Sequence, residues 1–187
     1  MSSRIVIERI ATEEVLCASA TPEDLSLAES YGAASRRAEA LAWRGIVRRE
    51  LGSEVVISYD EFGAPEVNIP DQYISVSHSR DFVVVMFADR PCAVDVEGSQ
   101  RDFRRVASKY LTAEEQTLAE QYELYGAMWC AKEAMYKYHR RGGVDFLRDT
   151  IIKAYRPEDD TLVATLMNNM LEVRLHRDGD LLIAEIY

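Results

Sequence analysis

The sequence predicts an α+β protein made of two half-domains, and three observations support this fold class. The chain has 187 residues, 48% of them hydrophobic, so it is long enough to bury a core. Each half contains a long amphipathic helical segment followed by about three strand-like segments. No low-complexity linker separates the halves. We therefore expect half-domains at residues 1–92 and 93–187, each a small antiparallel sheet with a long helix, packed tightly as one unit.

The first half is expected to combine short strands with helices. Residues 4–10 (RIVIERI) and 14–19 (EVLCAS) indicate short strands, and Thr21 with a proline after it is a typical helix start. Residues 33–51 place apolar side chains on one helical face and arginines on the other, which predicts an amphipathic helix that ends at Gly52. Residues 73–98 indicate three strands of one continuous sheet, joined by short polar turns.

The second half is expected to contain helices first and a strand meander last. A basic helical piece at residues 101–109 precedes helices at about 112–121 and 123–139. Three alternating segments then predict the closing strands, namely TLVATLM, MLEVRLH and LLIAEIY.

Charge and cysteine usage exclude several functional classes. The net charge of −10 and the pI near 4.9 argue against general binding to nucleic acid or anionic membranes, since such binding needs clustered positive charge. Cys17, Cys92 and Cys130 lack C-x-x-C spacing, which indicates buried thiols in a reducing compartment rather than disulfides or zinc. The sequence has neither a signal-peptide core nor about 18 consecutive apolar residues, so we expect a cytoplasmic protein without a membrane span.

Residues 93–99, AVDVEGS, carry two carboxylates inside an apolar run. In a strand, Asp95 and Glu97 point to one face while the valines beside them point to the other. Neighbouring carboxylates repel each other unless a cation lies between them, and their hard oxygen atoms suit Mg²⁺ or Ca²⁺. The alternative is an edge strand whose acids face water, and spacing alone favours this alternative.

A third carboxylate lies on the last predicted helix, in WCAKEAMYKYHRR. Trp129 and Glu133 are four residues apart and share a helix face, and Lys132 and Lys137 flank Glu133. Carboxylates flanked by lysines fit a magnesium-bridged pyrophosphate site, because Mg²⁺ uses few protein carboxylates together with substrate phosphates. The alternative is a surface ion pair between Glu133 and Lys137, with Trp129 in the core.

Ser77 and His78 end a predicted strand, where their side chains can hydrogen-bond phosphate oxygens. A lone histidine is more often structural, which is the alternative for His78. The chain has no G-x-S-x-G segment, so we exclude nucleophilic hydrolysis.

Taken in order, ISVSHS, AVDVE and WCAKEAMYK resemble the three motifs of the phosphopantetheinyl transferases, in the larger surfactin-type branch. The most specific match is W-x-x-K-E-A-x-x-K, and the resemblance covers about residues 36–137. It implies a pseudo-dimeric α+β fold and an enzyme of the holo-[carrier-protein] synthase type. Such an enzyme transfers the 4′-phosphopantetheine arm of coenzyme A to a serine of an apo acyl or peptidyl carrier protein and releases 3′,5′-ADP. Its pathway would be fatty acid, polyketide or nonribosomal peptide biosynthesis.

The resemblance also implies roles for individual residues. The ligands of Mg²⁺, or of Mn²⁺, would be Asp95, Glu97 and Glu133. The contacts to the phosphates of coenzyme A would come from Ser77, His78, Lys132, Lys137 and an arginine of the N-terminal helix, for which Arg48 aligns best and Arg44 second. The groups closest to the chemistry would be Glu133, Glu115 and Lys137.

The base that takes the serine proton would be Glu115 or Glu133. Thr112 and Glu115 also fit a capping box, in which the two residues cap the start of a helix for each other. Both roles of Glu115 stay open at this point.

This chain departs from the family pattern in ways that keep other functions open. Ala64 stands where a lysine is common between glycine and proline, and the chain is shorter than most surfactin-type members. The alternatives are a non-catalytic homologue that binds coenzyme A or a carrier protein and, less favoured, a metal-dependent phosphodiesterase. We expect a monomer, because two half-domains would replace a homodimer interface.

A basic segment follows the paired acids directly and consists of Arg101, Arg104, Arg105 and Lys109. In a protein of net charge −10, this segment could steer an acidic helix of a carrier protein. The alternative is a solvated basic face.

Overall fold

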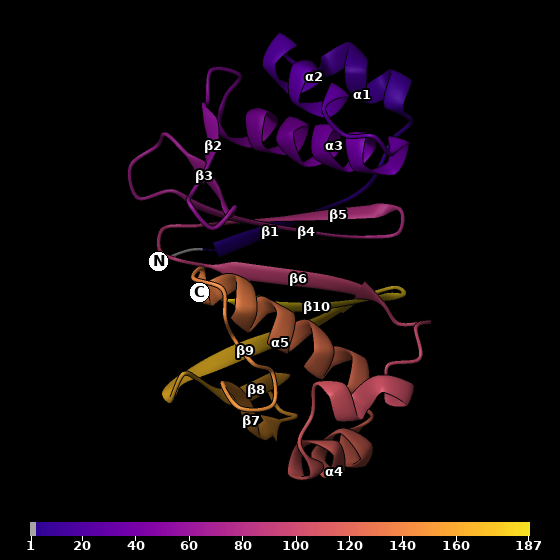
Figure 1. The fold of residues 1–187 in the computed structure, drawn as a ribbon, viewed down its shortest axis with the longest axis vertical. Coiled ribbons are helices and arrows are strands. Elements are labelled where there is room, and N and C mark those ends of the chain that lie inside the picture. The colour runs from indigo at the N-terminus through magenta and orange to yellow at the C-terminus, as the bar shows by residue number, and fades with distance from the viewer. Residues whose placement is uncertain (1–2) are drawn as a thin grey trace. The chain divides into compact units, whose positions relative to one another are not determined.

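The computed structural model describes residues 3–187 and confirms the α+β fold class (Figure 1). The chain divides into two compact units, Met1–Arg90 and Pro91–Tyr187. Each unit contains an antiparallel sheet with one long helix packed against it. The pseudo-dimeric relation and the tight packing of the two halves stay predictions. No helix in the described residues is long and apolar enough to cross a membrane.

The first unit contains three helices before most of its strands. Its elements are β1 (Ser3–Arg9), α1 (Glu13–Ser19), α2 (Pro22–Glu29), α3 (Ala34–Leu51), β2 (Ile57–Tyr59), β3 (Pro65–Val67), β4 (Tyr73–Ser79) and β5 (Phe82–Ala88). Strands β1, β5 and β4 form an antiparallel sheet in that order, while β2 and β3 form a separate hairpin. Helix α3 packs its buried face against β5 and contacts α1 and α2 on its other side.

The caps of two helices lie where the sequence predicts them. The Thr21 side chain accepts a hydrogen bond from the backbone N–H of Asp24 at 3.2 Å and so begins α2. Gly52 ends α3 with φ = +110°, a conformation that side chains with a Cβ rarely adopt.

The strand predicted at residues 14–19 is wrong, because this segment is the helix α1. Two acids, Glu13 and Glu14, occupy its first turn, where they complement the positive end of the helix dipole. Glu13 also accepts a hydrogen bond from Arg37 of α3 at 2.6 Å. Contact with α3 therefore stabilises a short helix that local apolar content does not reveal.

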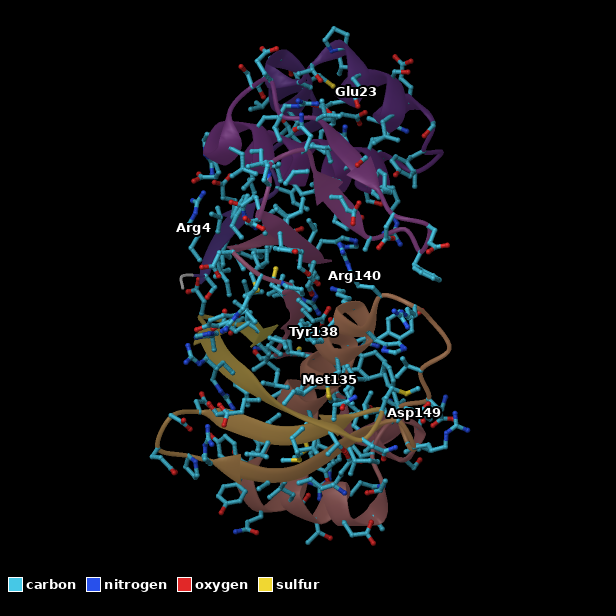
Figure 2. The ribbon with its side chains drawn as sticks, turned by 90° about the vertical axis from the view of Figure 1, so that its left-hand side faces the viewer. Arg4, Glu23, Met135, Tyr138, Arg140 and Asp149 are labelled. Atoms are coloured by element: carbon cyan, nitrogen blue, oxygen red, sulfur yellow. The ribbon has the colours of Figure 1, made fainter. Side chains whose placement is uncertain are left out.

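The second unit wraps one sheet around one helix. Its elements are β6 (Ala93–Gly98), the 3₁₀ helix η1 (Arg104–Lys109), α4 (Ala113–Tyr122), α5 (Tyr125–His139), β7 (Thr150–Arg156), β8 (Thr161–Leu166), β9 (Asn169–Asp178) and β10 (Leu181–Ile186). The sheet is antiparallel in the order β6-β10-β9-β8-β7. Helix α5 packs mainly on β6 and β10 (Figure 1), and Met135, labelled in Figure 2, is fully buried in this core.

Two strand predictions need correction in this unit. Strand β6 does not continue the sheet of β4 and β5, because it pairs with β10 along its whole length, from Ala93 opposite Ile186 to Gly98 opposite Leu181. Such a pairing joins residues far apart in the sequence, so a local pattern does not indicate it. Strand β7 was not predicted, and its alternation is broken by a register shift between Ile152 and Ala154.

Gly126 of α5 is a position where the core leaves no room for a side chain. A Cβ atom there would lie 2.5 Å from Leu182 Cδ1 and 2.9 Å from Phe103 Cδ2. We expect Gly126→Ala to lower the free energy of unfolding by about 1 to 2 kcal/mol, since overpacking outweighs the better helix propensity of alanine. The matched control is Gly45→Ala in α3, where nothing lies within 4 Å, and it should raise the stability by about 0.5 to 1 kcal/mol. Urea unfolding measures both, and equal effects would contradict the steric explanation.

Candidate active site

Helix α5 and strand β6 bring the three predicted carboxylates, Asp95, Glu97 and Glu133, to one face of the second unit, which we call the acidic face. Asp95 and Glu97 pair with Ala184 and Leu182 of β10, two residues whose side chains pack in the core beneath α5. Their side chains therefore lie on the face of the sheet that α5 covers, as alternation along a strand requires. Glu133 lies one helical turn from both Trp129, which binds Glu97, and Lys137, which binds Asp95, so it shares the side of α5 that faces β6.

Lys137 holds the first of these acids. Its Nζ donates to Asp95 Oδ1 at 2.8 Å and to the carbonyl oxygen of Val94 at 3.0 Å. The Asp95 side chain is only 9% exposed, so the ion pair lies in a partly dehydrated setting where charge interactions are stronger than in water. The predicted site places Lys137 beside the acids, and this contact with Asp95 joins α5 to β6.

Arg101 and Trp129 share the second acid. Arg101 Nη1 lies 2.7 Å from Glu97 Oε1, and Trp129 Nε1 donates to the same oxygen at 3.1 Å. The Arg101 guanidinium also lies over the rings of Phe103 and Trp129, at 5.0 and 5.4 Å from their centroids. Glu97 is therefore oriented by a fixed indole donor and by a cation from the basic segment.

Glu133 is the acid with the most perturbed environment. Burial raises its pKa, the neighbouring charges of Asp95 and Glu97 raise it further, and Lys137 and Arg101 oppose the shift. The three carboxylates thus interact electrostatically and carry more negative charge than the nearby cations neutralise.

The three carboxylates have the chemistry of ligands for a divalent cation, but their arrangement in the described residues is not that of a complete metal site. Carboxylate oxygens with excess negative charge are the ligands that Mg²⁺ and Mn²⁺ prefer. Among residues 3–187, no group of three or more histidine, cysteine, aspartate or glutamate side chains is arranged to hold a metal ion. Lys137 contacts one oxygen of Asp95 and Arg101 contacts one oxygen of Glu97, so an ion that used all three acids would share two of these carboxylates with the two cations.

Lys132 does not fit the phosphate contact expected for it. It is fully buried on a different side of α5, and its Nζ lies 2.8 Å from Glu115 Oε1. The same nitrogen donates to the carbonyl oxygens of Phe146 and Thr150, each at 2.7 Å. All three donors of the ammonium are used inside the core, and burial lowers the pKa of Lys132 while Glu115 opposes that shift.

Glu115 likewise does not fit the role of a base. Its Oε2 accepts the N–H of Thr112 at 2.8 Å and its Oε1 accepts the N–H of Ile152 at 2.8 Å. The Thr112 side chain accepts the N–H of Glu115 in return, so the predicted capping box is confirmed. At 1% exposure, Glu115 joins the start of α4 to α5 and β7 and has no access to a substrate hydroxyl.

Arg48 and Arg44 are held by Asp24 within the first unit. Arg48 Nε donates to Asp24 Oδ2 at 2.6 Å, and its Nη1 donates to the carbonyl oxygens of Ser53 and Val55. Arg44 is 1% exposed and donates to the same carboxylate. Burial would raise the pKa of Asp24, but hydrogen bonds from Arg48 and Arg44 outweigh it and lower the pKa to about 2. These arginines stabilise the packing of α2 on α3, which does not fit the expected phosphate contact.

Arg36 is not among the contacts predicted from the sequence, and the structure places it beside His78. Arg36 Nη1 lies 3.1 Å from His78 Nε2, and Glu39 Oε2 lies 3.4 Å from the same nitrogen. Ser77 precedes His78 in β4, so its side chain leaves the opposite face of the sheet, and it is buried. Arg36 lies in the first turn of α3 and is exposed, whereas Arg44 is buried and Arg48 is half-buried. Its place near the start of the helix is the feature that could have indicated an arginine accessible to a ligand.

The comparison with known families matches the second unit. The family description that matches is the 4′-phosphopantetheinyl transferase superfamily, over residues 91–184. This chain belongs to that superfamily. The matched range contains Asp95, Glu97, Glu133 and Lys137, so the acidic face described above lies within the part of this phosphopantetheinyl transferase homologue that carries the family pattern.

A curated relative extends the similarity into the first unit. The 4′-phosphopantetheinyl transferase Sfp of Bacillus subtilis (strain 168) is 25% identical over 150 residues. The aligned region is 75% of this chain and 58% of the relative, so the superfamily member described here matches less than two thirds of the length of Sfp.

Proposed function

We propose that this protein transfers the 4′-phosphopantetheine arm of coenzyme A to a serine of an apo acyl or peptidyl carrier protein and releases 3′,5′-ADP, with Mg²⁺ or Mn²⁺ as cofactor. The observation that carries this proposal is the set of three interacting carboxylates, Asp95, Glu97 and Glu133, beside Lys137. Superfamily membership and the similarity to a named 4′-phosphopantetheinyl transferase support it.

The proposed reaction is a phosphoryl transfer. The serine oxygen forms a bond to the β-phosphorus of coenzyme A, the bond from that phosphorus to the oxygen of 3′,5′-ADP breaks, and the serine proton goes to a base. We assign the base to Glu133, because Glu115 is committed to the core and because Glu133 lies on the side of α5 that faces Asp95 and Glu97. Lys137 would neutralise charge on the phosphate oxygens. A divalent ion held by the acids would supply further neutralisation of the pyrophosphate.

Contacts to the coenzyme are also assigned within the first unit. His78 keeps its proposed contact to phosphate, and Arg36 replaces Arg48 as the arginine of the N-terminal helix, because Arg36 lies beside His78 whereas Asp24 binds Arg48. Ser77 stays a candidate for a phosphate contact, from the face of β4 opposite to that of His78. These roles are proposals that single alanine variants and coenzyme A titration would test.

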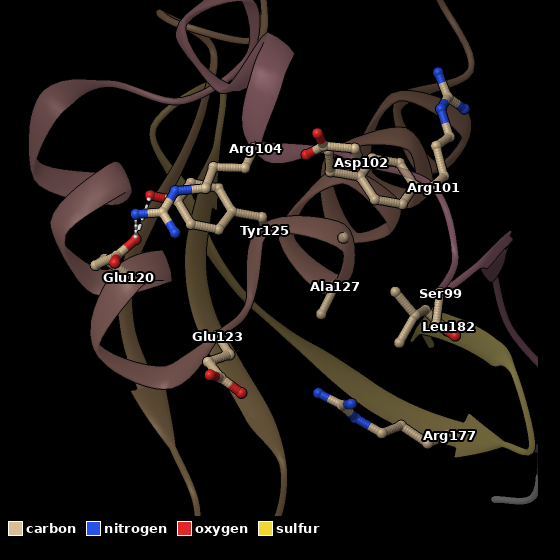
Figure 3. Close-up of a pocket in the computed structure, with 12 residues that line it drawn as sticks. Ser99, Arg101, Asp102, Arg104, Glu120, Glu123, Tyr125, Ala127, Arg177 and Leu182 are labelled. Atoms are coloured by element: carbon tan, nitrogen blue, oxygen red, sulfur yellow. Dashed lines mark hydrogen bonds and ion pairs between the residues drawn. The ribbon is translucent and has the colours of Figure 1, made fainter.

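The proposed carrier partner fits the basic segment. Arg104, Arg105 and Lys109 are exposed on η1, and within the described chain no ion pair involves the side chains of Arg105 or Lys109. A pocket of about 340 Å³ lies next to this segment, and its lining includes the basic Arg101, Arg104 and Arg177, the acidic Asp102, Glu120 and Glu123, and apolar groups such as Leu182 (Figure 3). The positive charge offered to a partner therefore comes mainly from the exposed Arg105 and Lys109 beside it. An acidic helix with some apolar side chains is the partner that this surface would recognise.

The function is tested by mass spectrometry of the carrier. The protein is incubated with coenzyme A, Mg²⁺ and several apo acyl and peptidyl carrier proteins, and the carriers are weighed. We expect a gain equal to one phosphopantetheine group, absent when coenzyme A is omitted or the metal is chelated. No gain with any carrier would overturn the transferase proposal.

A second candidate is a homologue that binds coenzyme A or a carrier without transfer. Ala64 favours it, because a cation common at this position of the family is missing from the turn between β2 and β3. Binding of coenzyme A with equal affinity in the native protein and in Asp95→Ala, and no transfer by either, would support this candidate.

A further inference from the structure

Arg101 belongs to the basic segment and also contacts the acidic face through Glu97. Its Nη1 is 2.7 Å from Glu97 Oε1, while its neighbours along the chain form the basic segment. The side chain is 52% exposed, and the rings of Phe103 and Trp129 support the guanidinium. Arg101 is therefore anchored by stacking and yet accessible to a second carboxylate from outside.

Arg104 provides a contrast three residues further on. Its Nη2 pairs with Glu120 Oε2 at 2.6 Å and its guanidinium lies over the ring of Tyr125. Figure 3 shows Arg104 turned toward Glu120, and Arg101 on the other side of the pocket with its guanidinium pointing away from them. Both arginines line the same pocket and carry the same charge, but only Arg101 contacts the acidic face.

We propose that Arg101 is a positioning residue that couples the docking of an acidic partner to the metal affinity of the acidic face, an inference that rests on the proposed function. Glu97 Oε1 accepts hydrogen bonds from Arg101 and Trp129. A carboxylate oxygen paired with a guanidinium is a weaker ligand, because the cation repels a divalent ion and occupies the oxygen.

An acidic side chain of a partner on the basic segment competes with Glu97 for the guanidinium of Arg101. When Arg101 turns to the partner, Glu97 keeps the Trp129 hydrogen bond, which holds its orientation, and loses the competing cation. By linkage, the partner then strengthens metal binding and the metal strengthens partner binding by the same factor. Lys137 stays with Asp95 in both arrangements, so the coupling acts on Glu97 alone.

The first test measures Mn²⁺ binding by electron paramagnetic resonance, without coenzyme A or carrier. Arg101→Gln is expected to bind Mn²⁺ about three- to tenfold more tightly than the native protein, since it removes a cation paired with one ligand. Arg104→Gln is the matched control and should stay within about twofold of the native affinity. Unchanged affinity in Arg101→Gln, or an equal gain in Arg104→Gln, would overturn the proposal.

The second test adds a carrier protein whose acceptor serine is replaced by alanine, so that no transfer occurs. We expect this carrier to tighten Mn²⁺ binding by the native protein about threefold or more and to leave Arg101→Gln unchanged. If the carrier binds and the Mn²⁺ affinity of the native protein does not change, the coupling is wrong. If no carrier binds while Arg101→Gln still tightens Mn²⁺ binding, the proposed function is wrong about its carrier partner. The competition between Arg101 and the metal ion for Glu97 would then still be supported.

Discussion

Replacing Lys132 with methionine is expected to lower the free energy of unfolding by about 3 to 5 kcal/mol, the loss typical of breaking a buried ion pair from one side. Lys132 is fully buried and its ammonium binds Glu115 and the carbonyl oxygens of Phe146 and Thr150. Without it, the carboxylate of Glu115 would stay in the core as an uncompensated charge. Urea unfolding of the variant and the native protein at pH 7 measures the difference.

A double variant separates charge burial from the loss of hydrogen bonds. Lys132→Met with Glu115→Gln removes both charges, while the glutamine oxygen can still accept the N–H of Ile152 or Thr112. Burial lowers the pKa of Lys132 and the Glu115 carboxylate opposes that shift, so keeping the ammonium charged in the core carries a desolvation cost. We therefore expect the double variant to recover about half or more of the lost stability. A double variant as unstable as Lys132→Met would assign the loss to the carbonyl contacts instead.

The surface lysine of β7 gives the control for this series. Lys153 is exposed, and Lys153→Met should change the stability by no more than about 0.5 kcal/mol. The series also tests the role of Lys132 that the family resemblance implies. If Lys132 acts only inside the core, the folded fraction of Lys132→Met binds coenzyme A with native affinity, whereas a direct phosphate contact would weaken this binding about tenfold or more.

The predictable part of the fold is the part that local chemistry decides. Thr21, Gly52 and the capping box of Thr112 mark helix ends through interactions within a few residues, so their positions follow from the sequence. The sheet that receives β6 and the helical state of residues 13–19 depend instead on partners far along the chain. A pattern of apolar residues does not carry that information.

The candidate site shows the same division. Alternation in β6 places Asp95 and Glu97 on one face, and the spacing of α5 places Glu133 on the side toward them. The family motif does not indicate which lysine of α5 is buried. Lys132 lies four residues after Met128 and three before Met135, both fully buried, and this stripe is the signal that assigns it to the core.

Replacing Glu133 with glutamine is expected to lower kcat/KM for carrier modification by about a thousandfold or more while leaving the fold intact. Burial and the charges of Asp95 and Glu97 raise the pKa of Glu133, so its ionised form is disfavoured in the folded protein. Removing that charge should leave the free energy of unfolding unchanged or slightly higher at pH 7, and should weaken Mn²⁺ binding. Glu172→Gln on β9, where the side chain pairs with Arg156, is the matched control and should keep full activity.

The opposite effects on stability and activity make this variant decisive. Replacing a residue that only supports packing lowers stability and activity together. A buried carboxylate that destabilises the fold by its charge is instead expected to serve binding or catalysis. Loss of stability in Glu133→Gln with native kcat/KM per folded molecule would show that the acids form a structural network. Loss of kcat/KM and of Mn²⁺ binding at full stability would assign a functional role to Glu133. Because Asp95 and Glu97 contribute to the raised pKa of Glu133 and belong to the same group of acids, Asp95→Asn should then weaken Mn²⁺ binding as well.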